Sequence, residues 1–140
     1  MAKLLGVFLA SIFALLGLLH IYWAFGGKHQ SESVIPTIDG KLAFNPSPFL
    51  TLLVALALFM AMLIILGQSG FLGTVVIPRQ FFYWGTLAIS LLFLLRSIGE
   101  FRLVGFFKTI RDTPFAYWDT WLFSPLCLLI AIMSFLILRR

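Results

Sequence analysis

Four ionisable side chains stand near the ends of strongly apolar segments of the chain: His20, Arg96, Glu100 and Asp119. An imidazole and a carboxylate can act as acid and base, and a guanidinium group binds anionic groups through paired hydrogen bonds. Ionisable groups at membrane depth are costly, face the protein interior and often mark functional sites. We therefore predict that the four line a pocket for a lipid or small amphiphilic ligand, with acid–base catalysis by His20 and Glu100 as a variant.

Three of these side chains also have a purely structural interpretation. Arg96 and Glu100 are four residues apart, so they could form an ion pair that closes the end of a helix. His20 could be a hydrogen-bonded packing residue at a contact between helices. The sequence alone leaves both interpretations open.

Three cations lie between the third and fourth apolar segments: Arg102, Lys108 and Arg111. Basic side chains beside a membrane span can bind lipid head groups, and we predict that role for all three, with simple solvation as the alternative. Either arginine could instead pair with Asp119, and Asp119 could also cap the start of a helix.

Other kinds of site have little support in the sequence. No nucleophile–base spacing, phosphate-binding loop or nucleic-acid motif is visible. A metal could bind His20, Glu100 and Asp119, but their spacing does not require one. Haem held by two histidines is not expected because His29 lies outside the apolar segments, and the single cysteine, Cys127, excludes an internal disulfide. We predict no metal and no cofactor.

The composition predicts an integral membrane protein. Of the 140 residues, 61% are hydrophobic and only 11% are charged. A soluble fold of this length would expose much of that apolar excess, whereas lipid accepts apolar surface on every side of a helix. The net charge of +5 comes without a basic run or basic domain, so we predict no nucleic-acid partner.

Four apolar segments have the roughly 20 residues that a spanning helix needs. They predict a single all-α domain over residues 1–140, an integral membrane four-helix bundle with helices at about 3–25, 48–66, 80–98 and 114–138. The first segment is too long for a signal peptide and is expected to be retained. Ser47 and Pro48 form a helix-start signal, with serine as the cap and proline at the first helical position.

The start of the fourth helix is ambiguous, because two cap-and-proline pairs precede its apolar part. Thr113 with Pro114 is one pair, and Ser124 with Pro125 is the other. If the helix begins at Pro114, Pro125 should kink it, because proline removes one backbone hydrogen bond and its ring crowds the preceding turn.

Small or polar residues form a stripe on three of the four predicted helices, because residues spaced by three or four positions share a helix face. The first helix carries Gly6, Ala10, Phe13, Gly17, His20 and Ala24. The third helix carries Thr86, Ser90, Ser97 and Glu100, and the fourth carries Thr120, Ser124, Cys127, Ala131 and Ser134. Such stripes favour close helix contact in lipid. The second helix has none and is predicted to be scaffold.

An even number of spans places both termini on one side of the membrane. That side carries Lys3, Arg79, Arg139 and Arg140 without an acidic residue, whereas the loop side carries six Lys or Arg and all five acidic residues. A count of Lys and Arg alone favours the loop side as cytoplasmic. We predict cytoplasmic termini in a multi-pass cell-membrane protein because several loop-side charges are expected to belong to the site. The apolar, spaced-cation segment 101–110 predicts a short interfacial helix or a re-entrant turn, broken near Gly99 or Gly105. Three Tyr-Trp pairs fit interfacial anchors: Tyr22-Trp23, Tyr83-Trp84 and Tyr117-Trp118.

Three stretches of the chain resemble a bacterial family of small membrane proteins of unknown function. They are HIYWAFGG from His20, LLRSIGEFRLVGFFK from Leu94 and FAYWDTWLFSPLCL from Phe115, and the resemblance covers nearly the whole chain. It implies a compact four-helix protein of the inner membrane and supplies no agreed activity. The residues that match the polar positions of its motif are His20, Arg96, Glu100, Lys108 and Asp119, and the family often has Asp at position 100.

Two other functions remain open beside ligand binding. The chain could be a structural or accessory subunit that works with a partner membrane protein. It could also be a small transporter, which would require a homo-oligomer because four helices enclose only a thin pathway. The lipid bilayer is a partner under every interpretation.

Overall fold

Four helices are long and apolar enough to cross a membrane, as predicted. The computed structural model describes residues 1–27, 31–72 and 76–139, so His29 lies outside the described residues. The first three spans are α1 (Ala2–Ala24), α3 (Pro48–Gln68) and α4 (Arg79–Ile98). The fourth is one continuous segment made of α5 (Pro114–Trp118), the π-helical turn η1 (Asp119–Phe123) and α6 (Ser124–Leu138).

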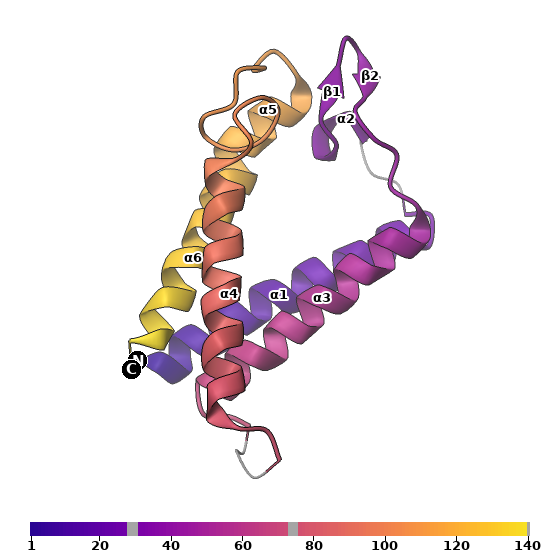
Figure 1. The fold of residues 1–140 in the computed structure, drawn as a ribbon. Coiled ribbons are helices and arrows are strands. Elements are labelled where there is room, and N and C mark those ends of the chain that lie inside the picture. The colour runs from indigo at the N-terminus through magenta and orange to yellow at the C-terminus, as the bar shows by residue number, and fades with distance from the viewer. Residues whose placement is uncertain (28–30, 73–75, 140) are drawn as a thin grey trace.

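The four spans form two antiparallel pairs, α1 with α3 and α4 with α6. The two helix pairs cross near the N- and C-termini of the chain. At the opposite ends of the helices the pairs are separated, so the molecule has two arms (Figure 1). The N- and C-termini lie next to each other at the crossing. We call the two arms the α1–α3 arm and the α4–α6 arm.

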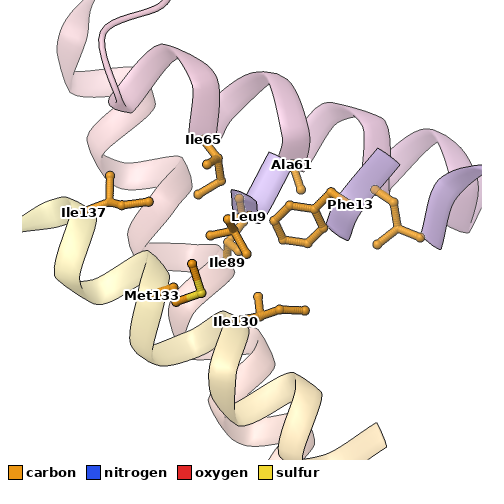
Figure 2. Close-up of a cluster of buried hydrophobic side chains, with 9 residues drawn as sticks. Leu9, Phe13, Ala61, Ile65, Ile89, Ile130, Met133 and Ile137 are labelled. Atoms are coloured by element: carbon orange, nitrogen blue, oxygen red, sulfur yellow. The ribbon is translucent and has the colours of Figure 1, made fainter. Parts of the chain in front are cut away.

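The hydrophobic core lies where the two arms cross. Figure 2 shows side chains from all four spans meeting there, and the buried set is Leu9, Phe13, Leu58, Ala61, Ile65, Ile89, Ile130, Met133 and Ile137. Lipid tails are as apolar as leucine, so close packing rather than water exclusion holds helices together in a bilayer. The core therefore joins the arms at one end and leaves their other ends to be joined by loops.

The stripe predicted on the first helix is the face that packs against α3. Gly6, Ala10, Phe13 and Gly17 are buried, whereas Leu15 on the opposite face is exposed. A Cβ atom at Gly17 would lie only 2.9 Å from the Phe59 ring, so the absent side chain allows the helices to approach. The prediction of a close helix contact on this face is confirmed.

The predicted start at Ser47 and Pro48 is confirmed, and of the two alternatives for the fourth span the structure has Thr113 and Pro114. The Ser47 hydroxyl accepts a hydrogen bond from the Leu50 amide at 3.2 Å. The Thr113 hydroxyl accepts one from the Ala116 amide at 3.1 Å, so the fourth span begins at Pro114. The distortion expected before Pro125 takes the form of the π-helical turn η1, which adds one residue to a helical turn.

The connection between α1 and α3 crosses the space between the arms. It contains α2 (Ser31–Val34) and a two-stranded hairpin of β1 (Thr37–Ile38) and β2 (Lys41–Leu42), in which Thr37 pairs with Leu42. Asp39 and Gly40 form its turn, both with positive φ, as a tight hairpin requires. Because α2 contacts α5, this connection links the separated ends of the two arms (Figure 1).

Residues 101–110 form no helix. Of the two predicted alternatives, the interfacial helix is therefore wrong for this segment, which folds back on the end of α4. The Phe106 amide donates a hydrogen bond to the Ser97 carbonyl at 2.8 Å.

Candidate functional site

Asp119 is the centre of a buried ion-pair cluster in the α4–α6 arm. Its side chain is 0% exposed. One carboxylate oxygen, Oδ1, accepts a hydrogen bond from Arg96 Nη2 at 2.8 Å. The other, Oδ2, accepts from the Gly105 amide at 2.8 Å and from Lys108 Nζ at 3.1 Å. Charge-assisted hydrogen bonds of this kind are about twice as strong as neutral ones, so they offset the cost of burying the carboxylate.

Lys108 belongs to this cluster and does not lie at the surface. The residue is only 2% exposed. Its ammonium group donates to Asp119 Oδ2, to the Gly105 carbonyl at 3.0 Å and to the Thr120 hydroxyl at 2.6 Å. Since an ammonium group has three donors, all of them are used. The structure thus gives Lys108 a buried ion-pair role in place of the predicted lipid head group.

The other two predicted head-group cations are exposed. Arg111 donates to the Lys108 carbonyl at 3.2 Å and to the Phe106 carbonyl at 3.3 Å, so it supports the loop that carries Lys108. Arg102 lies on the same loop, where its carbonyl accepts from the Ile110 amide at 2.9 Å. Neither arginine is the partner of Asp119, so the predicted pairing is wrong. The cluster uses Arg96 and Lys108.

Two glycines allow the loop to reach Asp119. Gly99 and Gly105 have φ of 86° and 89°, a region that residues with a Cβ rarely adopt. The backbone at Gly99 lies against that at Val104 and Gly105, and a Cβ atom at Gly99 would overlap the Val104 carbonyl. This crossing directs the Gly105 amide at the carboxylate. The turn η1 places Asp119 at the inner side of the fourth span.

Glu100 stands apart from the cluster. Its exposed carboxylate accepts a hydrogen bond from the Leu103 amide within the same loop. The helix ends at Ile98 and Gly99 turns the chain away, so position 100 is not on the helix face of Arg96. The alternative of an Arg96–Glu100 ion pair is therefore wrong, because Arg96 pairs with Asp119.

His20 lies in a different place, beside a cavity in the α1–α3 arm. The cavity has a volume of about 780 Å³. Its described lining residues are His20, Trp23, Val34, Ile35, Phe44, Asn45, Pro46, Pro48, Leu50, Thr51, Leu53, Val54 and Ala57. Arg96, Glu100 and Asp119 are not among them, so the single pocket expected from the sequence is divided between the two arms. The predicted acid–base pair of His20 and Glu100 is not formed in it.

The His20 ring is fixed by two neighbours. Its Nδ1 atom makes a 2.7 Å hydrogen bond with the Leu16 carbonyl. The ring also lies edge-to-face against Trp23, with ring centroids 5.1 Å apart. Since a carbonyl can only accept, Nδ1 carries a hydrogen. The Nε2 atom has no hydrogen-bond partner among the described residues.

A metal site has no geometric support in the described part of the chain. Within residues 1–27, 31–72 and 76–139, no three His, Cys, Asp or Glu side chains lie close enough to hold one ion. Cys127 is a buried free thiol on α6.

Residues 13–134 match a family model described as a protein of unknown function, DUF3995. The chain belongs to the DUF3995 family. No match is found among curated proteins or solved structures. The matched range includes the cavity and the cluster, so both lie within the part of the chain that defines DUF3995 membership. The predicted resemblance to a family without an assigned activity is confirmed.

Apart from His20, the sequence pointed to none of the residues that line the cavity in this DUF3995 protein. The helix predicted to be scaffold, α3, contributes Leu50, Leu53 and Ala57, and an expected interfacial anchor, Trp23, lines the cavity as well. Their apolar types carry no signal of a site, since spanning helices are apolar on every face. Sequence reasoning did not assign Gly105 and Thr120 to the site, although both bond to the cluster. The pair Gly99 and Gly105 was the available signal that the chain turns sharply there.

Lys108→Met is expected to lower the free energy of unfolding by about 1–3 kcal/mol. The Thr120 hydroxyl and the Gly105 carbonyl lose their donor, while Arg96 still neutralises Asp119. Thermal unfolding in detergent, followed by size-exclusion chromatography, measures the loss. Arg102→Met is the matched control, and its exposed side chain predicts a change within about 0.5 kcal/mol. Equal losses in the two variants would contradict the buried role of Lys108.

Proposed function

We propose that this protein binds a lipid or small amphiphile in the cavity beside His20. The observation that carries the proposal is the size and lining of that cavity. Its volume of about 780 Å³ falls within the range of ligand pockets, roughly 300–1,000 Å³. Most of the described lining residues are apolar, and His20, Asn45 and Thr51 add a few polar groups, the usual composition of a ligand site.

The cavity is open to the surroundings of the α1–α3 arm. Phe44, Leu50, Leu53 and Val54 line it and are also among the exposed large hydrophobic residues. In a membrane protein such surfaces meet lipid, so a bilayer molecule can enter from the side without crossing water. This access favours a lipid over a water-soluble ligand.

The ion-pair cluster has a supporting role in this proposal. It fixes the loop and the start of the fourth span, where α5 contacts α2. Val34 of α2 lines the cavity. The cluster in the α4–α6 arm therefore holds a wall of the cavity in the other arm, although it contributes no group to the lining.

The orientation follows from charge. The chain-end side carries four Lys or Arg residues and no acid, and the other side carries six, of which Arg96 and Lys108 are paired with Asp119. With those two set aside, each side has four, and the net positive charge of the chain-end side supports cytoplasmic termini. The cavity then faces the non-cytoplasmic side of a bacterial inner membrane, in keeping with the resemblance of the sequence to bacterial proteins.

Mass spectrometry of lipids retained after gentle purification tests the proposal. The wild-type protein is expected to retain a lipid in stoichiometric amount. Ala57→Trp fills the cavity and is expected to remove most of it, whereas Ala88→Trp, at an exposed position of α4, is expected to retain it. All three proteins should elute alike in size-exclusion chromatography.

Two results would overturn the proposal. An empty wild-type protein, or equal lipid in both tryptophan variants, would favour an accessory subunit without a ligand. A wild-type dimer that Ala57→Trp converts to monomer would show that a second copy covers the cavity.

A further inference from the structure

The described walls of the cavity carry no charge. The thirteen lining residues of the described chain include no Lys, Arg, Asp or Glu. An ionised head group placed there would lose its hydration without gaining an opposite charge, which is strongly unfavourable. The cations Arg96, which is partly exposed, and Lys108, which is buried, could hold a phosphate, but they are in the other arm and are paired with Asp119. The described lining of the cavity is therefore suited to an uncharged head group.

Of the three polar lining residues, Thr51 and His20 each make a hydrogen bond to a backbone carbonyl one turn earlier, and Asn45 is exposed. The Thr51 hydroxyl donates to the Ser47 carbonyl at 3.0 Å. His20 Nδ1 is held by the Leu16 carbonyl. In a neutral imidazole with hydrogen on Nδ1, the other nitrogen is an acceptor, and Nε2 has no hydrogen-bond partner among the described residues. An acceptor inside an apolar cavity calls for a ligand with a hydroxyl donor.

We propose that the cavity selects an uncharged lipid alcohol from the bilayer, whose hydroxyl donates to His20 Nε2. This inference rests on the proposed function and adds the chemical class of the ligand. The apolar body of the lipid lies against Leu53, Val54 and Ala57. Trp23 holds the imidazole by an edge-to-face contact, so the acceptor is oriented before the ligand binds. The preference for an alcohol then comes from one hydrogen bond and from a described lining that offers no lysine or arginine to a phosphate.

Competition binding with three lipids of identical acyl chains tests the head-group preference. Purified protein in detergent is loaded with radiolabelled dioleoylglycerol, which is displaced by unlabelled dioleoylglycerol, its 3-acetyl ester or dioleoylphosphatidic acid. The acetyl ester lacks the hydroxyl donor and is expected to bind roughly two- to ten-fold more weakly, the range for one hydrogen bond. The phosphatidic acid is expected to bind more weakly still.

Two variants assign the preference to His20. His20→Gln retains an acceptor oxygen near the position of Nε2 and is expected to keep the difference between alcohol and ester. His20→Phe retains a ring of similar size without the acceptor, and the alcohol and ester should then bind equally. Both variants are checked for wild-type elution and thermal unfolding, and the ratio of two affinities in one variant is insensitive to a partly unfolded sample.

The outcomes separate this inference from the proposed function. Equal binding of all three lipids to the wild-type protein, or an unchanged alcohol–ester difference in His20→Phe, would overturn the head-group assignment and leave lipid binding intact. Tighter binding of the phosphatidic acid would overturn it in favour of an anionic ligand. Failure of every lipid to bind the wild-type protein would overturn both.

Discussion

Replacing Asp119 with asparagine is expected to lower the free energy of unfolding by about 3–5 kcal/mol, the usual cost of removing one partner from a buried ion pair. The change conserves the shape of the side chain but removes its charge. Arg96 and Lys108 would then lie beside a neutral amide with no anion between them. The amide NH2 group, itself a donor, would take the place of a carboxylate oxygen that accepts hydrogen bonds from N–H groups. Thermal unfolding in detergent measures the effect.

The order of the effects distinguishes a network from a single ion pair. Asp119→Asn should cost more than Lys108→Met, because the lysine variant leaves one cation beside the carboxylate and the aspartate variant leaves two cations without an anion. Asp112→Asn, at an exposed position of the same loop, is the control and should change little. A loss in Asp119→Asn no larger than that in Asp112→Asn would show that the cluster does not stabilise the fold.

Gly105→Ala is expected to lower the free energy of unfolding by a similar amount, about 3–5 kcal/mol, from backbone strain and a weakened charged hydrogen bond. The φ of 89° is unfavourable for alanine, and its Cβ would overlap the Ile98 carbonyl. The loop must then move away from the end of α4. That movement withdraws the Gly105 amide from Asp119.

Gly40→Ala separates the effect of backbone strain from the effect of the close contact at Gly105. Gly40 has a φ of 75°, but nothing lies within 4 Å of the position its Cβ would take. Its replacement should cost only the strain of the backbone conformation, about 1–2 kcal/mol. Comparable unfolding temperatures for the two variants would mean that the backbone crossing at Gly99 and Gly105 is not required.

In the function proposed above, the two arms divide stability and binding between them. The α4–α6 arm holds the buried charges, whose hydrogen-bonding groups are largely satisfied by one another. The α1–α3 arm holds an open cavity whose described lining has no Lys, Arg, Asp or Glu, and one ring nitrogen of His20 has no partner among the described residues. This division explains why the polar residues singled out by type do not form one site: most of them stabilise a loop, and only His20 lines the cavity.

The number, length and starts of the spanning helices could be predicted from the sequence because the physical causes are local. A span needs about 20 apolar residues in a row, and a cap needs a serine or threonine three residues before the amide that it binds. Ser47 and Thr113 act in this way. The buried glycine stripe of α1 was also predictable, because it follows from helical periodicity alone.

Only the tertiary structure decided the partners of Asp119 and the place of His20. Arg96 is 23 positions from Asp119 in the chain, and the two meet because Gly99 ends α4, the loop folds back and η1 turns the carboxylate inward. The cavity is bounded by the end of α1, the first turns of α3 and the connection that contains α2, three segments that only the tertiary fold brings together. Neither the fold of a loop nor the crossing of two helix pairs is encoded in a periodic pattern, since both depend on contacts between residues distant in the chain.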